Sequence, residues 1–193
     1  MIKQILSLEH IISGCAANDN RFKELLYKRY YGYLMSVITR YLKDTNDAQE
    51  LLNDSFVKVF KHITSFSLPA DPEAAEKAFK GWIAKISSRT AIDFLKKKNR
   101  VVYVEEIAEI HTQVIYTDVL SSLNYKYIIH LLDELPEIQR LIFNLYEIEG
   151  FSHEEIGKLL NIPDNTCRTY LTRAKAKLRK LYTQSLIHPD GTN

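Results

Sequence analysis

Cysteine, glycine and proline are scarce in this sequence, and it contains no long hydrophobic run. Its 193 residues include 2 cysteines, 6 glycines and 5 prolines. Cys15 and Cys167 lie far apart and neither belongs to a CxxC pair, so we expect two reduced, packed thiols and neither a zinc site nor a disulfide framework. No apolar run approaches the roughly 20 residues of a membrane-spanning helix, and the N-terminal residues lack signal-peptide organisation. The sequence therefore predicts a cytoplasmic protein with no membrane insertion.

Catalytic motifs are also lacking. His153-Glu154-Glu155 does not have the HExxH spacing of a zinc peptidase, and there is neither a glycine-rich phosphate loop nor a nucleophile elbow. The carboxylates have the spacings of ordinary helix surfaces. We therefore expect no enzyme activity, no catalytic residue, no metal ligand, no cofactor and no small-molecule substrate.

Charge is small in sum but strongly segregated along the chain. The net charge is +2, yet residues 80–100 carry seven basic side chains against Asp93 alone, and residues 168–180 are basic again. The segment between these two blocks is acidic. This pattern predicts two nucleic-acid contacts on two modules.

Residues 152–181 predict two helices joined by a very short turn. Ser152 and Glu155 have the spacing of a capping box, which starts a helix. Asn161-Ile162-Pro163 then interrupts the pattern, because proline cannot continue the preceding helix. This combination is typical of a helix-turn-helix. An amphipathic helical hairpin with a solvated basic face is the alternative interpretation.

The second of these helices has one apolar stripe, and its other faces are basic. The apolar positions recur at steps of four and three and are Cys167, Leu171, Ala174, Leu178 and Leu181. Arg and Thr near the start of a helix in the major groove can contact base edges, whereas lysines further along suit phosphates. The predicted duplex-binding residues are Arg168, Thr169, Thr172, Arg173, Lys175 and Lys177.

Elsewhere the chain has helical periodicity and no strand pattern. Apolar spacing predicts helices over residues 6–16, 22–41, 48–66, 79–99 and 125–135, with another helix beginning near Pro136 and ending at Gly150. Residues 67–78 contain two prolines and are expected to form a loop. The predicted fold is all-α, with two small helical domains (1–100 and 124–193), a flexible linker (101–123) and the helix-turn-helix in the C-terminal domain.

Two surfaces of the N-terminal domain are candidates for binding. The helix over residues 48–66 has an acidic face opposite its apolar face, which is either a solvated first turn or a docking surface for a basic partner. Trp82 lies in the basic segment beside the predicted loop, and aromatic rings beside basic groups suit single-stranded DNA. Its spacing also indicates a side chain that is at least half buried.

These segments, in this order, resemble the bacterial RNA polymerase sigma factors of the extracytoplasmic-function type, which contain only regions 2 and 4. Residues 47–60 (DAQELLNDSFVKVF) are similar to region 2.2, and residues 79–100 (FKGWIAKISSRTAIDFLKKKNR) to regions 2.3 and 2.4. Residues 135–180 resemble region 4. The resemblance implies a factor that binds core RNA polymerase and directs promoter-specific transcription initiation.

The resemblance also implies partners and site residues. Core polymerase would be bound through its β′ clamp helices and β flap, promoter DNA at the minus-ten and minus-thirty-five elements, and an anti-sigma factor would hold the protein inactive. The implied core-binding residues are Asp47, Glu50, Leu51, Asn53, Asp54 and Phe56. The implied minus-ten residues, which would melt and bind the opening duplex, are Lys80, Trp82, Lys85, Arg89, Lys96 and Lys97. The minus-thirty-five element would be bound by the six duplex-binding residues named above.

The sequence departs from the family at a few positions. Arg89 stands where asparagine is usual, and Pro163 and Asn165 stand where serine and glycine are common at the start of the recognition helix. Two functions of other classes remain open. A stand-alone helix-turn-helix regulator would have an N-terminal sensing or dimerisation domain and would bind DNA without polymerase. A helical adaptor would bind no DNA.

Overall fold

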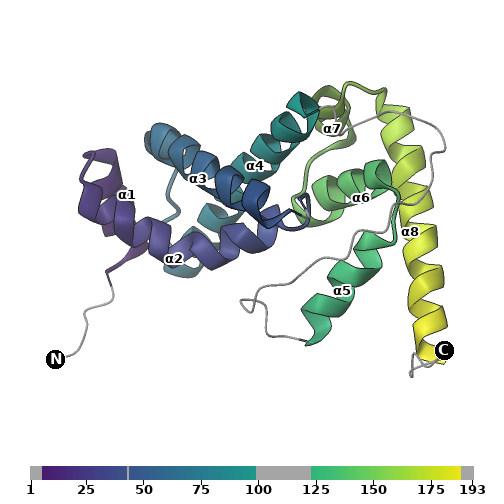
Figure 1. Ribbon diagram of the computed structural model, residues 1–193. Helices are drawn as coiled ribbons and strands as arrows, with labels where there is room; N and C mark the ends of the chain where they lie inside the picture. Colours follow the sequence, from purple (N-terminus) through teal and green to yellow (C-terminus); the bar gives the residue numbers. More distant parts are fainter. Residues whose placement is uncertain (1–5, 43, 99–122, 188–193) are drawn as a thin grey trace. The chain divides into compact units, whose positions relative to one another are not determined.

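The computed structural model describes residues 6–42, 44–98 and 123–187, and within these ranges every regular element is helical. The chain divides into two compact units, residues 1–94 and 95–193. The first contains α1 to α3 and nearly all of α4, and the second contains the last residues of α4 and α5 to α8 (Figure 1). This confirms the predicted all-α fold. Residues 101–122 of the predicted linker (101–123) lie outside the described residues.

Four helices and one short 3₁₀ turn make up the first unit. Their bounds are α1, Leu8–Ala16; α2, Asn20–Ile38; α3, Thr45–His62; η1, Ile63–Ser65; and α4, Pro72–Lys97. Asp19 and Asp44 cap α2 and α3, since their carboxylates accept hydrogen bonds from backbone amides of the first turn. The apolar faces of these helices meet in a core in which Leu26, Phe56 and Phe79 are almost completely buried.

The start of α4 corrects one sequence-based expectation. Residues 67–78 do not form a loop throughout, because the helix begins at Pro72 and not at Phe79. Pro72 is the first helical residue, where the missing amide hydrogen is not needed. Asp71 precedes it and caps the helix, with its Oδ2 accepting from the amide of Ala74 at 2.7 Å. The connection to η1 is therefore only six residues long, residues 66–71.

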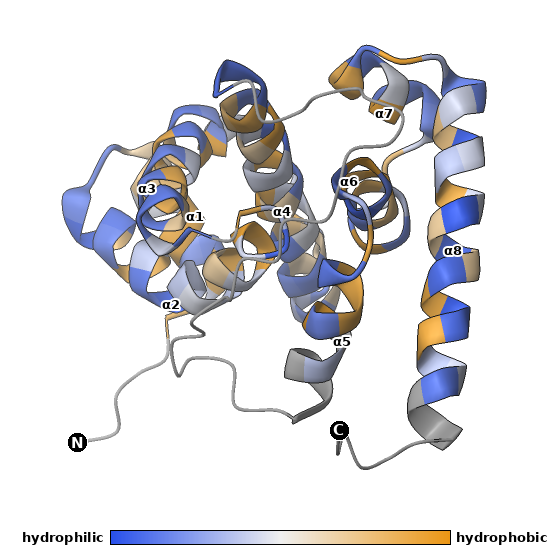
Figure 2. Cartoon of the chain, turned by 45° about the vertical axis from the view of Figure 1, so that its right-hand side comes forward, coloured by the Kyte–Doolittle hydropathy of each residue, from blue (hydrophilic) through white to orange (hydrophobic). Residues whose placement is uncertain are grey.

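The second unit contains the helix-turn-helix and two preceding helices. The bounds are α5, Leu123–Asp133; α6, Glu137–Phe143; the π-helical turn η2, Asn144–Ile148; α7, His153–Leu160; and α8, Asp164–Ile187. Ile129, Leu132, Leu135 and Ala174 form a core cluster that joins α5 to α8. Figure 2 shows hydrophobic and hydrophilic residues recurring along α8, as expected for a helix with one buried stripe.

The predicted boundaries of the helix-turn-helix are confirmed. Ser152 and Glu155 form the complete capping box at the start of α7, with each side chain bonded to the other residue's backbone amide. Gly150 has φ of +70°, which suits its predicted place after a helix end. Asn161 ends α7 with φ of +56°, a left-handed conformation that asparagine tolerates.

Gly157 makes the tight turn possible, a role that the sequence analysis did not assign. A Cβ atom built on Gly157 would lie 2.8 Å from the carbonyl oxygen of Ile162. The same turn brings the amide of Ile162 within 3.0 Å of the Gly157 carbonyl. A glycine in the middle of a helical pattern was the available signal, because such a residue often marks close backbone approach.

Candidate nucleic-acid and partner interfaces

Five of the six predicted duplex-binding residues are exposed on α8, four of them near its start and Lys175 further along. Arg168, Thr169, Thr172 and Arg173 are all exposed in the first turns of the helix. Cys167, Leu171 and Ala174 are buried against the rest of the unit, as predicted. We call Thr169, Thr172, Arg173 and Ala176 the recognition face, because their spacing of three and four residues puts them on one side of the helix. Exposed Ala176 was not predicted to belong to it.

Both threonine hydroxyls of the recognition face are held by their own helix. Thr169 Oγ1 donates to the carbonyl of Asn165 at 3.0 Å, and Thr172 Oγ1 donates to that of Arg168 at 2.9 Å. This orientation uses the hydroxyl hydrogen internally and leaves the oxygen lone pairs and the methyl group toward solvent. The threonines can therefore accept a hydrogen bond from a base or contact a thymine methyl group.

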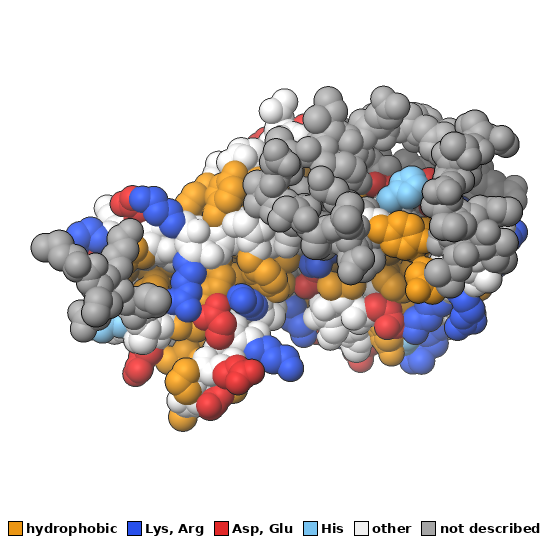
Figure 3. Space-filling model, turned by 90° about the horizontal axis from the view of Figure 1, so that it is seen from below, with side chains coloured by type: hydrophobic (Ala, Val, Ile, Leu, Met, Phe, Trp, Pro, Cys, Tyr) orange, Lys and Arg blue, Asp and Glu red, His pale blue; other side chains and the backbone are white. Residues whose placement is uncertain are grey.

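The two predicted phosphate-binding lysines lie beside the recognition face. Lys175 is paired with Glu147 of η2, with Nζ 2.6 Å from Oε1. Lys177 follows Arg173 by four residues and is partly buried, near the edge of the recognition face. Figure 3, which views the molecule from below, shows basic side chains gathered in the part of the molecule that contains α8.

Both cysteines of the chain are buried and form no disulfide, in agreement with the sequence analysis. Burial raises the pKa of the Cys15 thiol to about 11. It also raises the pKa of the Cys167 thiol, and the Asp164 carboxylate acts in the same direction. Both thiols therefore remain protonated and pack as small apolar groups.

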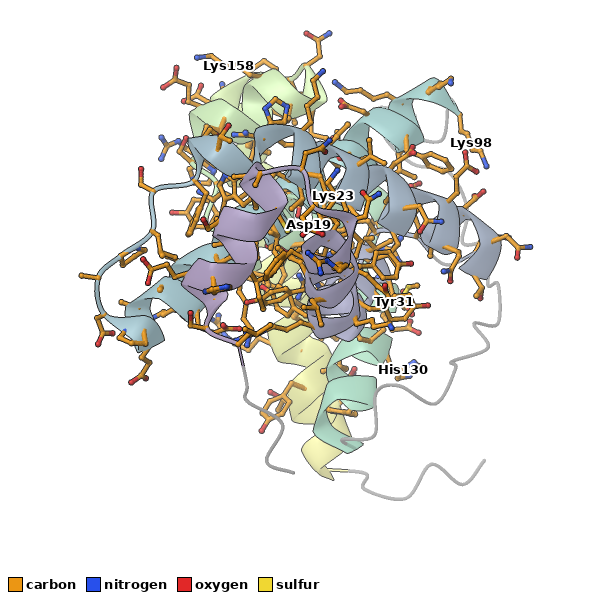
Figure 4. All side chains as sticks on the ribbon, turned by 90° about the vertical axis from the view of Figure 1, so that its left-hand side faces the viewer. Asp19, Lys23, Tyr31, Lys98, His130 and Lys158 are labelled. Carbon is orange, nitrogen blue, oxygen red and sulfur yellow. The ribbon has the colours of Figure 1, made fainter. Side chains whose placement is uncertain are left out.

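Four of the predicted minus-ten residues share one stripe of α4. Successive spacings of three, four and seven residues put Trp82, Lys85, Arg89 and Lys96 on one side of the helix. Arg89 and Lys96 are exposed, whereas Trp82 and Lys85 are partly buried. Lys97 is exposed next to this stripe, and Figure 4 shows Lys98 at the same end of the helix. We call the first four residues the basic stripe.

Lys80 points to the opposite side of α4, toward α2. Its Nζ lies 3.6 Å from Glu76 Oε1 and 5.8 Å from the centre of the Tyr33 ring. Glu76 also accepts from Arg29 at 2.8 Å and from the buried Tyr30 hydroxyl at 3.0 Å. This network ties α2 to α4, so Lys80 contributes to the packing of the two helices and does not extend the basic stripe.

Trp82 is largely buried in an aromatic cluster, in agreement with its spacing. Its ring centre lies 5.3 Å from that of Phe66 and 5.7 Å from that of Phe79. Phe66 and Phe79 make an edge-to-face contact at 5.2 Å. The cluster packs Phe66, the first residue after η1, against α4, and Trp82 stays partly exposed.

The acidic face of α3 includes only part of the predicted core-binding set. Glu50, Asn53 and Asp54 are exposed, whereas Asp47 is only 9% exposed and Leu51 and Phe56 belong to the core. Val57 lies one turn beyond Asn53 and is 64% exposed. We call Glu50, Asn53, Asp54 and Val57 the docking face. The sequence analysis did not include Val57. Its position outside the apolar stripe of α3 could have identified it as exposed.

Two tyrosines of α2 border the docking face. The Tyr27 hydroxyl donates to Asn53 Oδ1 at 3.1 Å, and the Tyr31 hydroxyl donates to Gln49 Oε1 at 3.2 Å. The Tyr27 ring also packs against Phe56, with centres 4.5 Å apart. These contacts hold the Asn53 amide so that its NH₂ group is left to donate outward. Contacts between helices of this kind have no signature in the sequence.

His153, at the start of α7, is set between opposite charges. Its ring stacks on Tyr146 with centres 4.3 Å apart, and its Nδ1 is buried. Burial lowers the His153 pKa, and the positive charges of Arg168 and Lys175 act in the same direction, against Asp164. We therefore expect a neutral imidazole near pH 7.

The lowered His153 pKa predicts a pH-dependent stability. Below the usual value of 6.5, the unfolded chain binds a proton more readily than the folded one, so the free energy of unfolding falls as the pH drops through 6.5 toward the folded-state pKa. Above 6.5 this contribution is constant. NMR titration of the His153 ring should give a midpoint below 6.5, and His153→Phe should remove its part of the pH dependence. A midpoint at or above 6.5 would contradict this prediction.

No helix in the described ranges combines the length and apolarity that crossing a bilayer requires. Among the same residues, His, Cys, Asp and Glu side chains form no group that could hold a metal ion.

Comparison with known proteins matches each unit to one family description. Residues 26–101 match "Sigma-70 region 2", and residues 125–178 match "Sigma-70, region 4". The chain is 28% identical over 182 residues to the ECF RNA polymerase sigma-E factor of Haemophilus influenzae, covering 88% of this chain and 92% of that protein. It is 24% identical over 177 residues to the factor of the same name from Escherichia coli K12, covering 86% and 88%.

A more distant similarity exists to a solved structure, the sigma factor RpoE in complex with the anti-sigma factor NepR from Bartonella quintana. The TM-score is 0.47 and the identity 19%, covering 83% of this chain and 96% of that chain.

Proposed function

The chain belongs to the sigma-70 family, as a member of the extracytoplasmic-function type with regions 2 and 4, and from this we propose that it binds core RNA polymerase and directs promoter-specific transcription initiation. Polymerase supplies the chemistry of RNA synthesis, and this chain has no catalytic role of its own. It acts in the cytoplasm, where polymerase and promoter DNA are found. An anti-sigma protein is a further proposed partner, which follows from the family resemblance.

The recognition face is the observation that carries this proposal. It presents a guanidinium, two hydroxyl groups and a small apolar side chain on one side of the second helix of a helix-turn-helix. Such a helix fits the major groove, where arginine can donate two hydrogen bonds to guanine. We propose that this face binds the minus-thirty-five element and that Arg168 stands at its edge.

The basic stripe of α4 is proposed to bind the opening minus-ten element. Cations along one line, of which Arg89 and Lys96 are exposed and Lys85 is partly exposed, suit the backbone of a single strand. The partly exposed Trp82 ring beside them suits a base that has left the stack. Unstacking costs a few kcal/mol, which these contacts would offset. Lys80 is left out of this set because it faces α2.

The docking face of α3 is proposed to bind the β′ clamp helices of core polymerase. It combines two exposed carboxylates, a fixed amide and one exposed apolar side chain, which suits a partner surface with basic and apolar groups. Leu51 and Phe56 support this face from within the core, where the partner cannot contact them. Residues 1–100 would then form the region 2 domain and residues 124–193 the region 4 domain.

Co-elution with core RNA polymerase from the same source tests the proposal first. A stoichiometric complex in size-exclusion chromatography is the expected result, and promoter sequences can then be selected with that holoenzyme. If the chain instead bound a duplex tightly by itself and formed no complex with core, it would be a stand-alone regulator. In that case the roles proposed for α3 and α4 would be wrong.

Arg173→Ala tests the recognition face. If Arg173 donates two hydrogen bonds to one base, we expect its loss to weaken holoenzyme binding by about 1–3 kcal/mol and to relax selectivity at one or two positions of the minus-thirty-five element. Competition binding with promoters mutated at each position measures this. An equal loss on every sequence would assign Arg173 to a phosphate instead.

A further inference from the structure

Two basic side chains on one edge of α8 are already paired with carboxylates of their own unit. Arg168 Nη2 lies 3.8 Å from Asp164 Oδ2, and Lys175 Nζ lies 2.6 Å from Glu147 Oε1. The first pair is within α8, one turn apart, whereas the second joins α8 to η2. A lysine beside the recognition face is therefore neutralised by a residue outside the helix-turn-helix.

The position of Glu147 depends on the π-helical turn. In η2 the amide of Glu149 donates to the carbonyl of Asn144 at 3.0 Å, a bond across five residues that widens the helix. The turn also carries Tyr146, whose ring centre lies 5.8 Å from Lys175 Nζ. Tyr146 is stacked on His153 at the start of α7. Lys175 is thus held between a carboxylate and an aromatic face that η2 supplies.

We propose that Glu147 masks Lys175 and thereby weakens sequence-independent DNA binding by the recognition helix. This inference rests on the proposed function, because it requires that α8 lies in the major groove. A phosphate that reaches Lys175 must displace the Glu147 carboxylate, and the same negative charge repels that phosphate. One electrostatic contact that every DNA sequence could offer is therefore suppressed, which raises the ratio of specific to non-specific binding.

The pair is open enough to be exchanged. The Lys175 and Glu147 side chains are 45% and 33% exposed, and ion pairs at such positions contribute little to stability. Breaking the pair should therefore leave the fold intact. An alternative role, in which the pair pins η2 against α8, predicts instead a loss of stability and of DNA affinity when Glu147 is changed.

Glu147→Gln in the full chain tests the masking. The probe is a labelled 30-base-pair duplex of random sequence, and binding is followed by fluorescence anisotropy between 50 and 200 mM KCl. We expect about fivefold tighter binding at the lowest salt, the gain that corresponds to freeing one exposed ion pair. We also expect the slope of log K against log salt to steepen by about 0.9, the value for one further phosphate contact. Glu147→Asp shortens the side chain but keeps its charge, and should give a smaller gain.

Matched variants show where the gain comes from. Glu24→Gln removes one negative charge from an exposed ion pair with Lys28 on α2, and should change affinity less than Glu147→Gln does. In a Lys175→Gln background, Glu147→Gln should add little. Equal gains for Glu24→Gln and Glu147→Gln, a gain that persists without Lys175, or a loss of affinity or thermal stability in both Glu147 variants would each overturn the masking.

Arg173→Ala in the same assay separates this inference from the proposed function. If Arg173→Ala weakens duplex binding and Glu147→Gln does not strengthen it, the masking alone is wrong. If neither substitution changes duplex binding, α8 does not bind DNA, and the proposed function fails together with the inference.

Discussion

Asp133→Ala should destabilise the second unit by roughly 3 kcal/mol, the lower end of the cost of removing one partner of a buried ion pair. Arg140 Nη1 donates to Asp133 Oδ1 at 2.7 Å, and the two side chains are only 9% and 18% exposed. The pair joins the end of α5 to α6. Without the carboxylate, the guanidinium would remain buried with no charge to balance it, and its Nε is already buried.

Denaturant unfolding followed by circular dichroism measures this loss. Trp82 is the only tryptophan and belongs to the first unit, so its fluorescence reports on that unit separately. The double variant Asp133→Leu/Arg140→Leu is the control, because replacing both charges with apolar groups is often close to neutral. An unchanged unfolding midpoint in Asp133→Ala would show that water already compensates Arg140.

Asp54→Lys should abolish the complex with core polymerase while the protein stays folded. Asp54 is exposed on the docking face and is not part of the core, so reversing its charge should cost little stability. At an interface, like charges brought together cost several kcal/mol. Co-elution with core polymerase, together with an unchanged circular dichroism spectrum, measures both effects.

Glu9→Lys provides the matched control for Asp54→Lys. It makes the same charge change at an exposed carboxylate in the first turn of α1, outside the docking face. This variant should retain core binding. Wild-type affinity in Asp54→Lys would remove Asp54 from the interface. An equal loss in both variants would mean that overall charge, and not the docking face, governs the association.

Most of the secondary structure follows from local sequence. The capping box at Ser152, the break at Pro163 and the apolar stripe of α8 were sufficient to predict the helix-turn-helix, because caps and periodicity act over a few residues. The start of α4 was predicted wrongly for a local reason too. Pro72 was interpreted as part of a loop, although a proline after an aspartate is also a good helix start.

The candidate surfaces were predictable only in part. Periodicity alone separates the exposed Arg173 from the buried Leu171, and it could also have identified Val57 as exposed. It could not show that Lys80 faces Glu76 and Tyr33, because that depends on how α2 packs against α4. A basic side chain in a basic segment can therefore be assigned to a nucleic-acid contact only after the side chains packed around it are known.

The sequence by itself determined the helices, their apolar faces and the family, since each depends on residues close together in the chain or on motifs in a fixed order. The tertiary structure decided which of the exposed charges are already paired. Lys175 and Glu147, like Asp133 and Arg140, lie on different elements and meet only because those elements pack together. Pairing between distant charges follows from that packing, and the packing is set by the buried apolar faces, not by the charges themselves.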